Sequence, residues 1–367
     1  MLRHLGPGPD HDDSADPAAD PLPVARTRGR PGSIMVTGGA GYIGSHVALA
    51  LLGAGWPVVI LDDLSTGRLR TMHGLCQVVV GDAGDRGPVR AVLEAHDVIG
   101  VIHMAGSIVV PESVRRPLGY YGNNTTASHS LIRACVEHGI GAFVFSSTAA
   151  VYGQVEVSPV PEDAPTRPAS PYGASKLMVE QMLRDAGQAC DLPYAVLRYF
   201  NVAGADPLFR CGQNPGGSTH LLKVACEVAL GERPALPVYG TDWPTRDGTC
   251  VRDFIHVGDL AAAHVLALDY LLAGGRSTTL NCGYGRGYSV REVVAAVGRV
   301  AGRPVPTADS PRRPGDAGEV VAANERLRAT LGWEPRYAEI DTVVRHALAW
   351  ERLLRQERAR EAARQAA

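Results

Sequence analysis

Residues 37–44 have the sequence TGGAGYIG and directly follow a short apolar run, Ile34–Thr37. Gly38, Gly41 and Gly44 recur every third residue, a spacing that permits a tight turn, close approach of a pyrophosphate to the backbone and close packing of the next helix. The amides and the dipole at the start of that helix attract phosphate groups. The segment therefore predicts a strand-turn-helix unit that binds a dinucleotide.

In the sequence that follows this turn, short apolar runs alternate with longer segments of helical period. Such alternation predicts an α/β fold, a Rossmann-type doubly wound parallel sheet with a smaller C-terminal α/β lobe for the substrate. The runs expected to be buried strands are Ile34–Thr37, Pro57–Leu61, Cys76–Val80, Val98–His103, Ala142–Ser146 and Tyr194–Arg198.

The composition along the chain predicts four parts. Residues 1–31 are rich in Pro, Asp, Ala and Gly without a period, which is typical of a disordered leader. The dinucleotide-binding domain is expected at residues 33–200 plus about 239–275, and the smaller lobe at about 201–238 plus 276–350. Residues 351–367 are expected to form a charged, solvated tail, either a helix or a frayed end.

Charge and cysteine content exclude several classes of function. The net charge is −2 with acids and bases interspersed, so neither nucleic acid nor a membrane surface is an expected partner. No apolar run is long enough to span a bilayer, and the N-terminus lacks the apolar core of a signal peptide. The seven cysteines never occur as CxxC. This pattern predicts a reducing cytoplasm and no metal site.

Acidic and small residues close the next predicted strands. Asp62 lies 21 positions after Gly41, where it can accept hydrogen bonds from the adenosine ribose and repel a 2′-phosphate. NAD is therefore favoured over NADP. Asp82 is expected near the adenine, although a helix N-cap is an equally good interpretation. The residues expected to contact the dinucleotide are Gly38, Gly41, Tyr42, Ile43, Gly44, Asp62, Asp82, Ala105 and Gly106.

Tyr172 and Lys176 are the candidate catalytic pair. They lie four residues apart after Pro171, which suits the start of a helix, so both side chains share one helix face. A free tyrosine has a pKa of about 10, and a nearby ammonium favours the phenolate. Thr148 ends the fifth predicted strand, at the sheet edge where such folds bind ligands. Taken alone, Thr148 would satisfy local backbone; together the three predict an acid/base site for a sugar hydroxyl.

Several motifs together resemble the UDP-glucose 4-epimerase family of the extended short-chain dehydrogenase/reductase superfamily. The resemblance covers residues 33 to about 350, and its most specific motifs are SPYGASKLMVEQ, RYFNVAGA and GTCVRDFIHV. It implies roles for Tyr172 as acid/base, Lys176 as its helper and Thr148 beside the sugar 4-hydroxyl. The further residues that it implies are Asn124 near the cofactor and Asn201, His220, Leu221, Arg252, Arg313, Asp316 and Val320 near the substrate.

The activity that the resemblance implies is interconversion of UDP-glucose and UDP-galactose, by C4 oxidation with tightly bound NAD, rotation of the 4-keto intermediate and re-reduction. It also implies a homodimer through helices around Glu112–His138 and Pro171–Cys190. The sequence departs from the family pattern at Ile108, where a lysine is common, at Lys223, where a proline is usual, and at Val320, where a tyrosine or cysteine is common.

Three alternatives stay open beside this reading of the residues. The first is 4-epimerisation of another UDP-sugar, which would be UDP-GlcNAc, a UDP-uronic acid or a UDP-pentose. A nucleotide-sugar 4,6-dehydratase starts with the same oxidation but uses an Asp-Glu pair after the strand-five hydroxyl, where this chain has Ala149 and Ala150. A non-catalytic NAD-sensing protein would have no need for the Tyr/Lys pair.

Overall fold

The structure, a computed structural model, describes residues 30–68, 72, 74–214, 219–313 and 315–366. The predicted disordered leader, residues 1–31, lies outside these residues except for its last two positions. Arg30 packs its guanidinium 4.3 Å from the centre of the Trp56 ring and pairs with Asp269 at 2.8 Å. Arg30 thus packs on the body of the protein through cation–π and charge contacts, although the sequence predicted that the leader would extend to residue 31.

Seven parallel strands form the main sheet, in the order β10-β6-β5-β4-β1-β2-β3. The apolar runs predicted six of them, with ends that differ by at most two residues. The predicted doubly wound parallel sheet is therefore confirmed. The strands are β1 (Ser33–Thr37), β2 (Val58–Asp62), β3 (Gln77–Val80), β4 (Val98–His103), β5 (Ala142–Thr148), β6 (Tyr194–Tyr199) and β10 (Thr278–Cys282).

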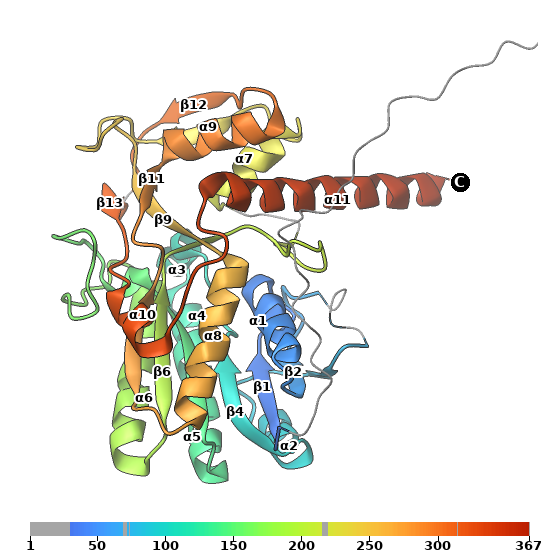
Figure 1. Ribbon diagram of the computed structural model, residues 1–367, viewed down its shortest axis with the longest axis vertical. Helices are drawn as coiled ribbons and strands as arrows, with labels where there is room; N and C mark the ends of the chain where they lie inside the picture. Colours follow the sequence, from blue (N-terminus) through green and yellow to red (C-terminus); the bar gives the residue numbers. More distant parts are fainter. Residues whose placement is uncertain (1–29, 69–71, 73, 215–218, 314, 367) are drawn as a thin grey trace, which may run out of the picture.

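Helices cover both faces of this sheet (Figure 1). One face packs against α1 (Tyr42–Gly53) and α8 (Val257–Leu272). The other packs against α2 (Arg86–Ala95), α5 (Ala127–His138) and α6 (Pro171–Cys190). Alternate residues of each strand serve the two cores, as the pleat requires. Shorter elements are α3 (Val110–Arg115), α4 (Pro117–Tyr120), the π-helix η2 (Tyr121–Thr126), the 3-10 turn η3 (Ala149–Val151) and α10 (Glu325–Leu331).

A smaller lobe lies over the carboxyl ends of the main strands. Its four-stranded sheet contains β7 (Asn201–Ala203), β9 (Val251–His256), β11 (Gly287–Ser289) and β13 (Glu319–Val320), with β9 paired to the other three. A second, two-stranded sheet contains β8 (Leu236–Tyr239) and β12 (Thr307–Ser310). The helices α7 (Leu221–Ala229), α9 (Val290–Ala301) and α11 (Ile340–Ala366) share its apolar core.

The chain crosses between the two lobes more often than the predicted boundaries allow. Strand β9, expected in the dinucleotide-binding domain, belongs to the small sheet, whereas β10, expected in the small lobe, pairs with β6 as the seventh main strand. Which sheet a short apolar strand joins depends on long-range pairing, and the local pattern that defines the strand does not contain that information.

The C-terminal helix also differs from the predicted solvated tail at residues 351–367. Helix α11 continues without a break through Trp350, and Glu351 is only 3% exposed because it pairs with Lys223 of α7 at 2.5 Å. Leu354 is buried one turn later. Figure 1 shows the remaining turns extending beyond the body of the molecule, and Arg358 there pairs with Glu232.

Candidate active site

The glycine turn between β1 and α1 leaves no room for side chains. Gly38 has a φ of +67°, and a Cβ there would lie 2.7 Å from the backbone nitrogen of Ala105 at the end of β4. A Cβ on Gly44 would lie 2.1 Å from the carbonyl oxygen of Gly38. Helix α1 begins at Tyr42, and its N-cap, Gly41, makes no side-chain cap. The first amides of α1 are thus presented at a narrow turn, which suits a pyrophosphate.

Asp62 ends β2 beside this turn and is 6% exposed. Its carboxylate accepts hydrogen bonds from the backbone amides of Ala40, at 2.9 Å, and Leu64, at 2.8 Å. Asp82, after β3, is exposed and accepts from the Gly84 amide at 2.7 Å. The N-cap of α2 is Asp85, so Asp82 closes the preceding turn and is not that cap.

Asn124 lies at the centre of the π-helix η2 and is 2% exposed. Its amide side chain is fully engaged: Oδ1 accepts from the Ser107 amide at 2.8 Å, while Nδ2 donates to the Ser107 carbonyl and to Ser175 Oγ, each at 3.0 Å. A Cβ on Gly106 would lie 3.0 Å from Asn124 Oδ1 and 3.6 Å from Lys176 Nζ. Short π-helical segments often occur at functional sites. Here one brings the predicted cofactor-contacting residues Asn124 and Gly106 next to Lys176.

The structure brings the predicted trio together. Ser170 caps α6, and Pro171 begins it, so Tyr172 and Lys176 lie on its first two turns facing the end of β5. Thr148 is the last residue of β5, and its hydroxyl lies close enough to the Tyr172 phenol to lower the pKa of that phenol. Lys176 Nζ donates to the Ser146 carbonyl at 3.0 Å. All three side chains are less than 10% exposed, so the protein shields them from bulk water.

Burial dominates the ionisation of this site. It raises the pKa of Tyr172, and the Thr148 hydroxyl partly opposes the rise. Burial lowers the pKa of Lys176 to about 8, and the carboxylate of Glu180 partly opposes that fall. His103, beside Lys176, is buried in β4 and has its pKa lowered to about 3, so it stays neutral. Because His103 is neutral, it adds no second positive charge beside the Lys176 ammonium.

The small sheet carries three of the predicted substrate residues: Asn201, Arg252 and Val320. Through β9 it aligns Asn201 of β7 with Phe254, and Val320 of β13 with Arg252. Arg252 donates to the Val251 carbonyl at 2.9 Å. The Arg313 side chain donates to Asp316 at 3.0 Å and lies 4.6 Å from the centre of the Tyr239 ring.

The two arginines and Asp316 lie around one buried thiol. The pKa of Cys250 is raised by burial, with smaller electrostatic influences from Arg252, Asp316 and Arg313. By contrast, His220 and Leu221 begin α7, on a different element, where His220 Nδ1 lies 2.9 Å from Gln213 Nε2. The guanidinium groups thus gather near the small sheet, and His220 stands at the start of a separate helix.

The prediction from sequence missed the residues behind the trio. Glu180 is 2% exposed and pairs with Arg198 of β6, and Ser147 also contacts it. One signal was present in the sequence: Glu180 follows Lys176 at the same interval of four that separates Lys176 from Tyr172.

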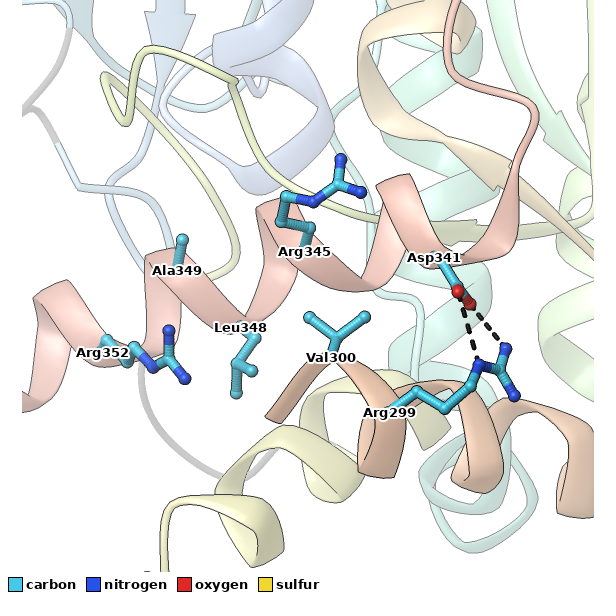
Figure 2. A pocket seen from close by; sticks show the side chains of 7 residues that line it. All are labelled: Arg299, Val300, Asp341, Arg345, Leu348, Ala349 and Arg352. Atoms are coloured by element: carbon cyan, nitrogen blue, oxygen red, sulfur yellow. Dashed lines mark hydrogen bonds and ion pairs between the residues drawn. The ribbon is translucent and has the colours of Figure 1, made fainter. Parts of the chain in front are cut away.

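A surface cavity of about 380 Å³ lies away from these residues, between α9 and α11. Figure 2 shows its lining side chains, with Arg299 paired to Asp341 at its edge. Because none of the predicted site residues lines it, the candidate active site is defined by side-chain geometry at the sheet edge.

Across the described part of the chain, no helix is long and apolar enough to cross a membrane. The same residues contain no cluster of His, Cys, Asp or Glu suited to a metal ion.

Comparisons with known proteins identify the family of the chain. The sequence pattern of the NAD dependent epimerase/dehydratase family matches residues 34–283. A UDP-glucose 4-epimerase of Azospirillum brasilense is 57% identical over 323 residues, covering 88% of this chain and 93% of that protein. A crystal structure of UDP-glucose-4-epimerase from Stenotrophomonas maltophila, with bound NAD and formylated UDP-arabinopyranose, has a TM-score of 0.86 at 39% identity and covers 89% of this chain and 99% of its own. The UDP-Glc/GlcNAc 4-epimerase of Campylobacter jejuni has a TM-score of 0.77 at 40% identity, covering 88% and 99%.

Proposed function

The chain belongs to the NAD dependent epimerase/dehydratase family, and we propose that it interconverts UDP-glucose and UDP-galactose by inverting C4 of the sugar. The observation that carries this proposal is the convergence of Thr148, Tyr172 and Lys176 at the carboxyl edge of the main sheet. The reaction places the enzyme in galactose metabolism, and the reducing cytoplasm remains the proposed location.

The residues present fit NAD. The turn at Gly38 and Gly44 is so tight that a Cβ at either position would meet backbone atoms, and the first amides of α1 follow it directly. The Asp62 carboxylate stands where a 2′-phosphate would be repelled. When bound, NAD supplies a hydride acceptor and donor that is regenerated within each turnover.

The chain's own residues move one proton. Tyr172 accepts the proton of the sugar 4-hydroxyl, while the Thr148 hydroxyl holds that oxygen in place. The Lys176 ammonium favours the phenolate that must precede this step, because an opposite charge stabilises the ionised form. After the 4-keto sugar has turned in the pocket, Tyr172 returns the proton to the same oxygen.

The small lobe is proposed to hold the diphosphate while the sugar turns. Arg252 and Arg313 offer planar guanidinium groups, which pair bidentately with phosphate oxygens, and Asp316 lies beside them for the uridine ribose. Asn201, His220 and Leu221 complete the proposed nucleotide-sugar contacts. A tether through the diphosphate leaves the hexose free to present either face to the Tyr172 side of the site.

The test of this function is incubation of the purified protein with UDP-galactose and no added NAD. We expect UDP-glucose to form until the two sugars reach equilibrium, because the cofactor remains bound and is regenerated. Ala149 and Ala150 follow Thr148 where a dehydratase needs an acid and a base, so no dehydrated 4-keto-6-deoxy sugar is expected. Accumulation of such a product would replace the epimerase assignment with a dehydratase.

Replacing Asp62 by Asn is expected to reduce the preference for NAD over NADP at least about tenfold, because two unit charges about 4 Å apart interact by about 4 kcal/mol at intermediate dielectric. The measurement is reactivation of cofactor-stripped protein by each dinucleotide. Asp63→Asn is the matched control, since this neighbouring carboxylate is exposed and bonds only to Ser65 in the hydrogen bonds described. Equal reactivation of the wild type by NAD and NADP would disprove the role of Asp62.

Val320 is proposed to leave room for a C2 acetamido group, as a hypothesis about the range of sugars. It is partly buried beside Tyr152 and Phe200, and it is much smaller than a tyrosine. We expect the wild type to interconvert UDP-GalNAc and UDP-GlcNAc, and Val320→Tyr to lower kcat/KM for UDP-GalNAc relative to UDP-galactose about tenfold, since overpacking costs about 1–3 kcal/mol. An unchanged ratio between the two substrates in the variant would show that Val320 is not the gate.

A homodimer is the proposed assembly. Three apolar side chains stand exposed on neighbouring helices: Val114 on α3, Leu118 on α4 and Met178 on α6, at 62%, 81% and 46% exposure. An apolar group of this kind on the surface typically marks a protein interface. These helices belong to the segments through which the family resemblance implies that a second copy binds.

A further inference from the structure

Glu180 is a buried carboxylate that the proposed reaction does not use. It follows Tyr172 and Lys176 at successive intervals of four residues on α6, so the three side chains point from the same face of the helix. Only 2% of Glu180 is exposed. A buried charge is costly unless it is paired and hydrogen-bonded. Its partners therefore indicate what it does.

Arg198 of β6 holds the Glu180 carboxyl group in place. The guanidinium Nε lies 3.0 Å from Oε1 and 3.2 Å from Oε2, and Nη2 lies 2.5 Å from Oε2. Arg198 is itself fixed, because Nη1 donates to the Tyr152 hydroxyl at 3.0 Å and to the Glu162 carbonyl at 3.1 Å. The carboxylate thus has a single, rigid position.

Glu180 and Lys176 bind two consecutive residues of β5. Ser147 Oγ donates to Glu180 Oε1 at 2.5 Å, and Lys176 Nζ donates to the Ser146 carbonyl at 3.0 Å. The next residue is Thr148, whose hydroxyl contacts Tyr172. The end of the catalytic strand is therefore attached to the catalytic helix at two adjacent points, one of which depends on Glu180.

We propose that Glu180 is a positioning residue of the epimerisation: fixed by Arg198, it holds Ser147 beside Thr148 and keeps the Lys176 ammonium charged behind Tyr172. This inference rests on the proposed function of the same site. It assigns a functional role to an ion pair that otherwise would serve stability alone.

The surroundings of Lys176 explain why a carboxylate is needed. Burial lowers the pKa of Lys176 to about 8, and Glu180 is the group that opposes this fall. Among the residues described around this site, Tyr172 lies on the same helix as the ammonium, and His103 of β4 is neutral because burial lowers its pKa to about 3. Removing the Glu180 charge would leave Lys176 with the unpaired Arg198 guanidinium nearby. The lysine would then lose its proton at a lower pH.

Because the chain contains few lysines, the pKa of the Lys176 amine can be measured directly. Lys176 and Lys223 are the only lysines among the 36 basic residues of the sequence. Protein labelled with carbon-13 at the lysine ε position will give two lysine resonances, and the titration of each reports the pKa of its amine. Lys223 is paired with Glu351, so Glu351→Gln moves the Lys223 resonance and assigns both.

We expect the Lys176 midpoint to fall by about one unit or more in Glu180→Gln, because the removed charge lies one helical turn away. Glu180→Asp keeps the charge and should restore most of the midpoint. Glu351→Gln is the matched control: it also removes a buried, paired carboxylate, and it should lower the melting temperature without moving the Lys176 midpoint. An unmoved Lys176 midpoint in Glu180→Gln would overturn the proposal.

Activity gives the second readout. In Glu180→Gln we expect kcat to fall about tenfold or more, as a fraction of a general acid–base term, with KM for UDP-galactose changed less than about threefold. The alkaline limb of the pH–rate profile should move to lower pH with the Lys176 midpoint.

If Glu180→Gln fails to fold, the double variant Glu180→Met with Arg198→Met removes both charges together. A folded double variant with wild-type kcat and wild-type Lys176 midpoint contradicts the proposal. Wild-type protein inactive on UDP-galactose would instead contradict the proposed function.

Discussion

Tyr172→Phe is expected to lower kcat for UDP-galactose by about 100- to 10,000-fold, the range of a general acid–base term. The variant loses only a hydroxyl, so the ring still fills its buried site at the start of α6. Bound NAD and the melting temperature should stay close to wild type. The measurement is the initial rate of UDP-glucose formation by purified protein with its NAD content determined.

A second tyrosine provides the control for Tyr172. Tyr284 donates its hydroxyl proton to Asp259 at 2.6 Å and accepts from the His256 amide at 3.1 Å, away from the trio. Tyr284→Phe removes the acceptor of the His256 amide and one of the donors to Asp259, which costs about 1–3 kcal/mol of stability, and turnover by the folded protein should persist. If Tyr172→Phe retained more than half of wild-type turnover, the assignment of the acid/base group would be wrong.

Lys176→Met is expected to have the second largest effect, a loss of about 100-fold or more in kcat near neutral pH. Methionine fills similar volume without the charge, so the Tyr172 phenolate loses the ammonium that stabilises it. The pKa of Lys176 is about 8, so in wild type the ammonium is present below that pH and is lost as the pH rises through it. Wild-type turnover should accordingly decline on the alkaline side.

The pH–rate profile distinguishes the role of Lys176 from simple damage. In Lys176→Met the alkaline decline should vanish, and the acid limb should move to higher pH because Tyr172 is harder to deprotonate. Lys223→Met is the matched control, because it also removes a buried lysine that is paired with carboxylates, here on α7 and α11. A profile of wild-type shape at reduced height in Lys176→Met would mean that the lysine only supports the fold.

Much of the fold could be predicted because its signals are local. The turn at Gly38–Gly44 and six of the main strands are defined by residues within a few positions of one another. The missed features all depend on partners far along the chain. Strand β10 pairs with β6 about 80 residues earlier, and Glu351 is buried only because Lys223 meets it from α7.

The residues of the candidate site also fall into those that local sequence predicts and those that depend on distant partners. Tyr172 and Lys176 could be predicted from helix spacing, and Thr148 from its place at a strand end. Glu180 shares this spacing, but its burial could not be predicted, because a glutamate on a helix is normally solvated and its partner Arg198 lies on a strand further along the chain. Arg252 and Arg313 came from family resemblance alone, since nothing in their local sequence distinguishes them from surface arginines.

The most direct test of the account follows a single hydrogen. UDP-galactose carrying deuterium at C4 is incubated with the purified protein in ordinary water without added NAD, and the product is analysed by mass spectrometry and NMR. Oxidation and re-reduction at C4 within one closed site predict UDP-glucose that keeps its deuterium at C4. Product that has exchanged the label for solvent hydrogen, or the absence of any UDP-glucose, would contradict the account.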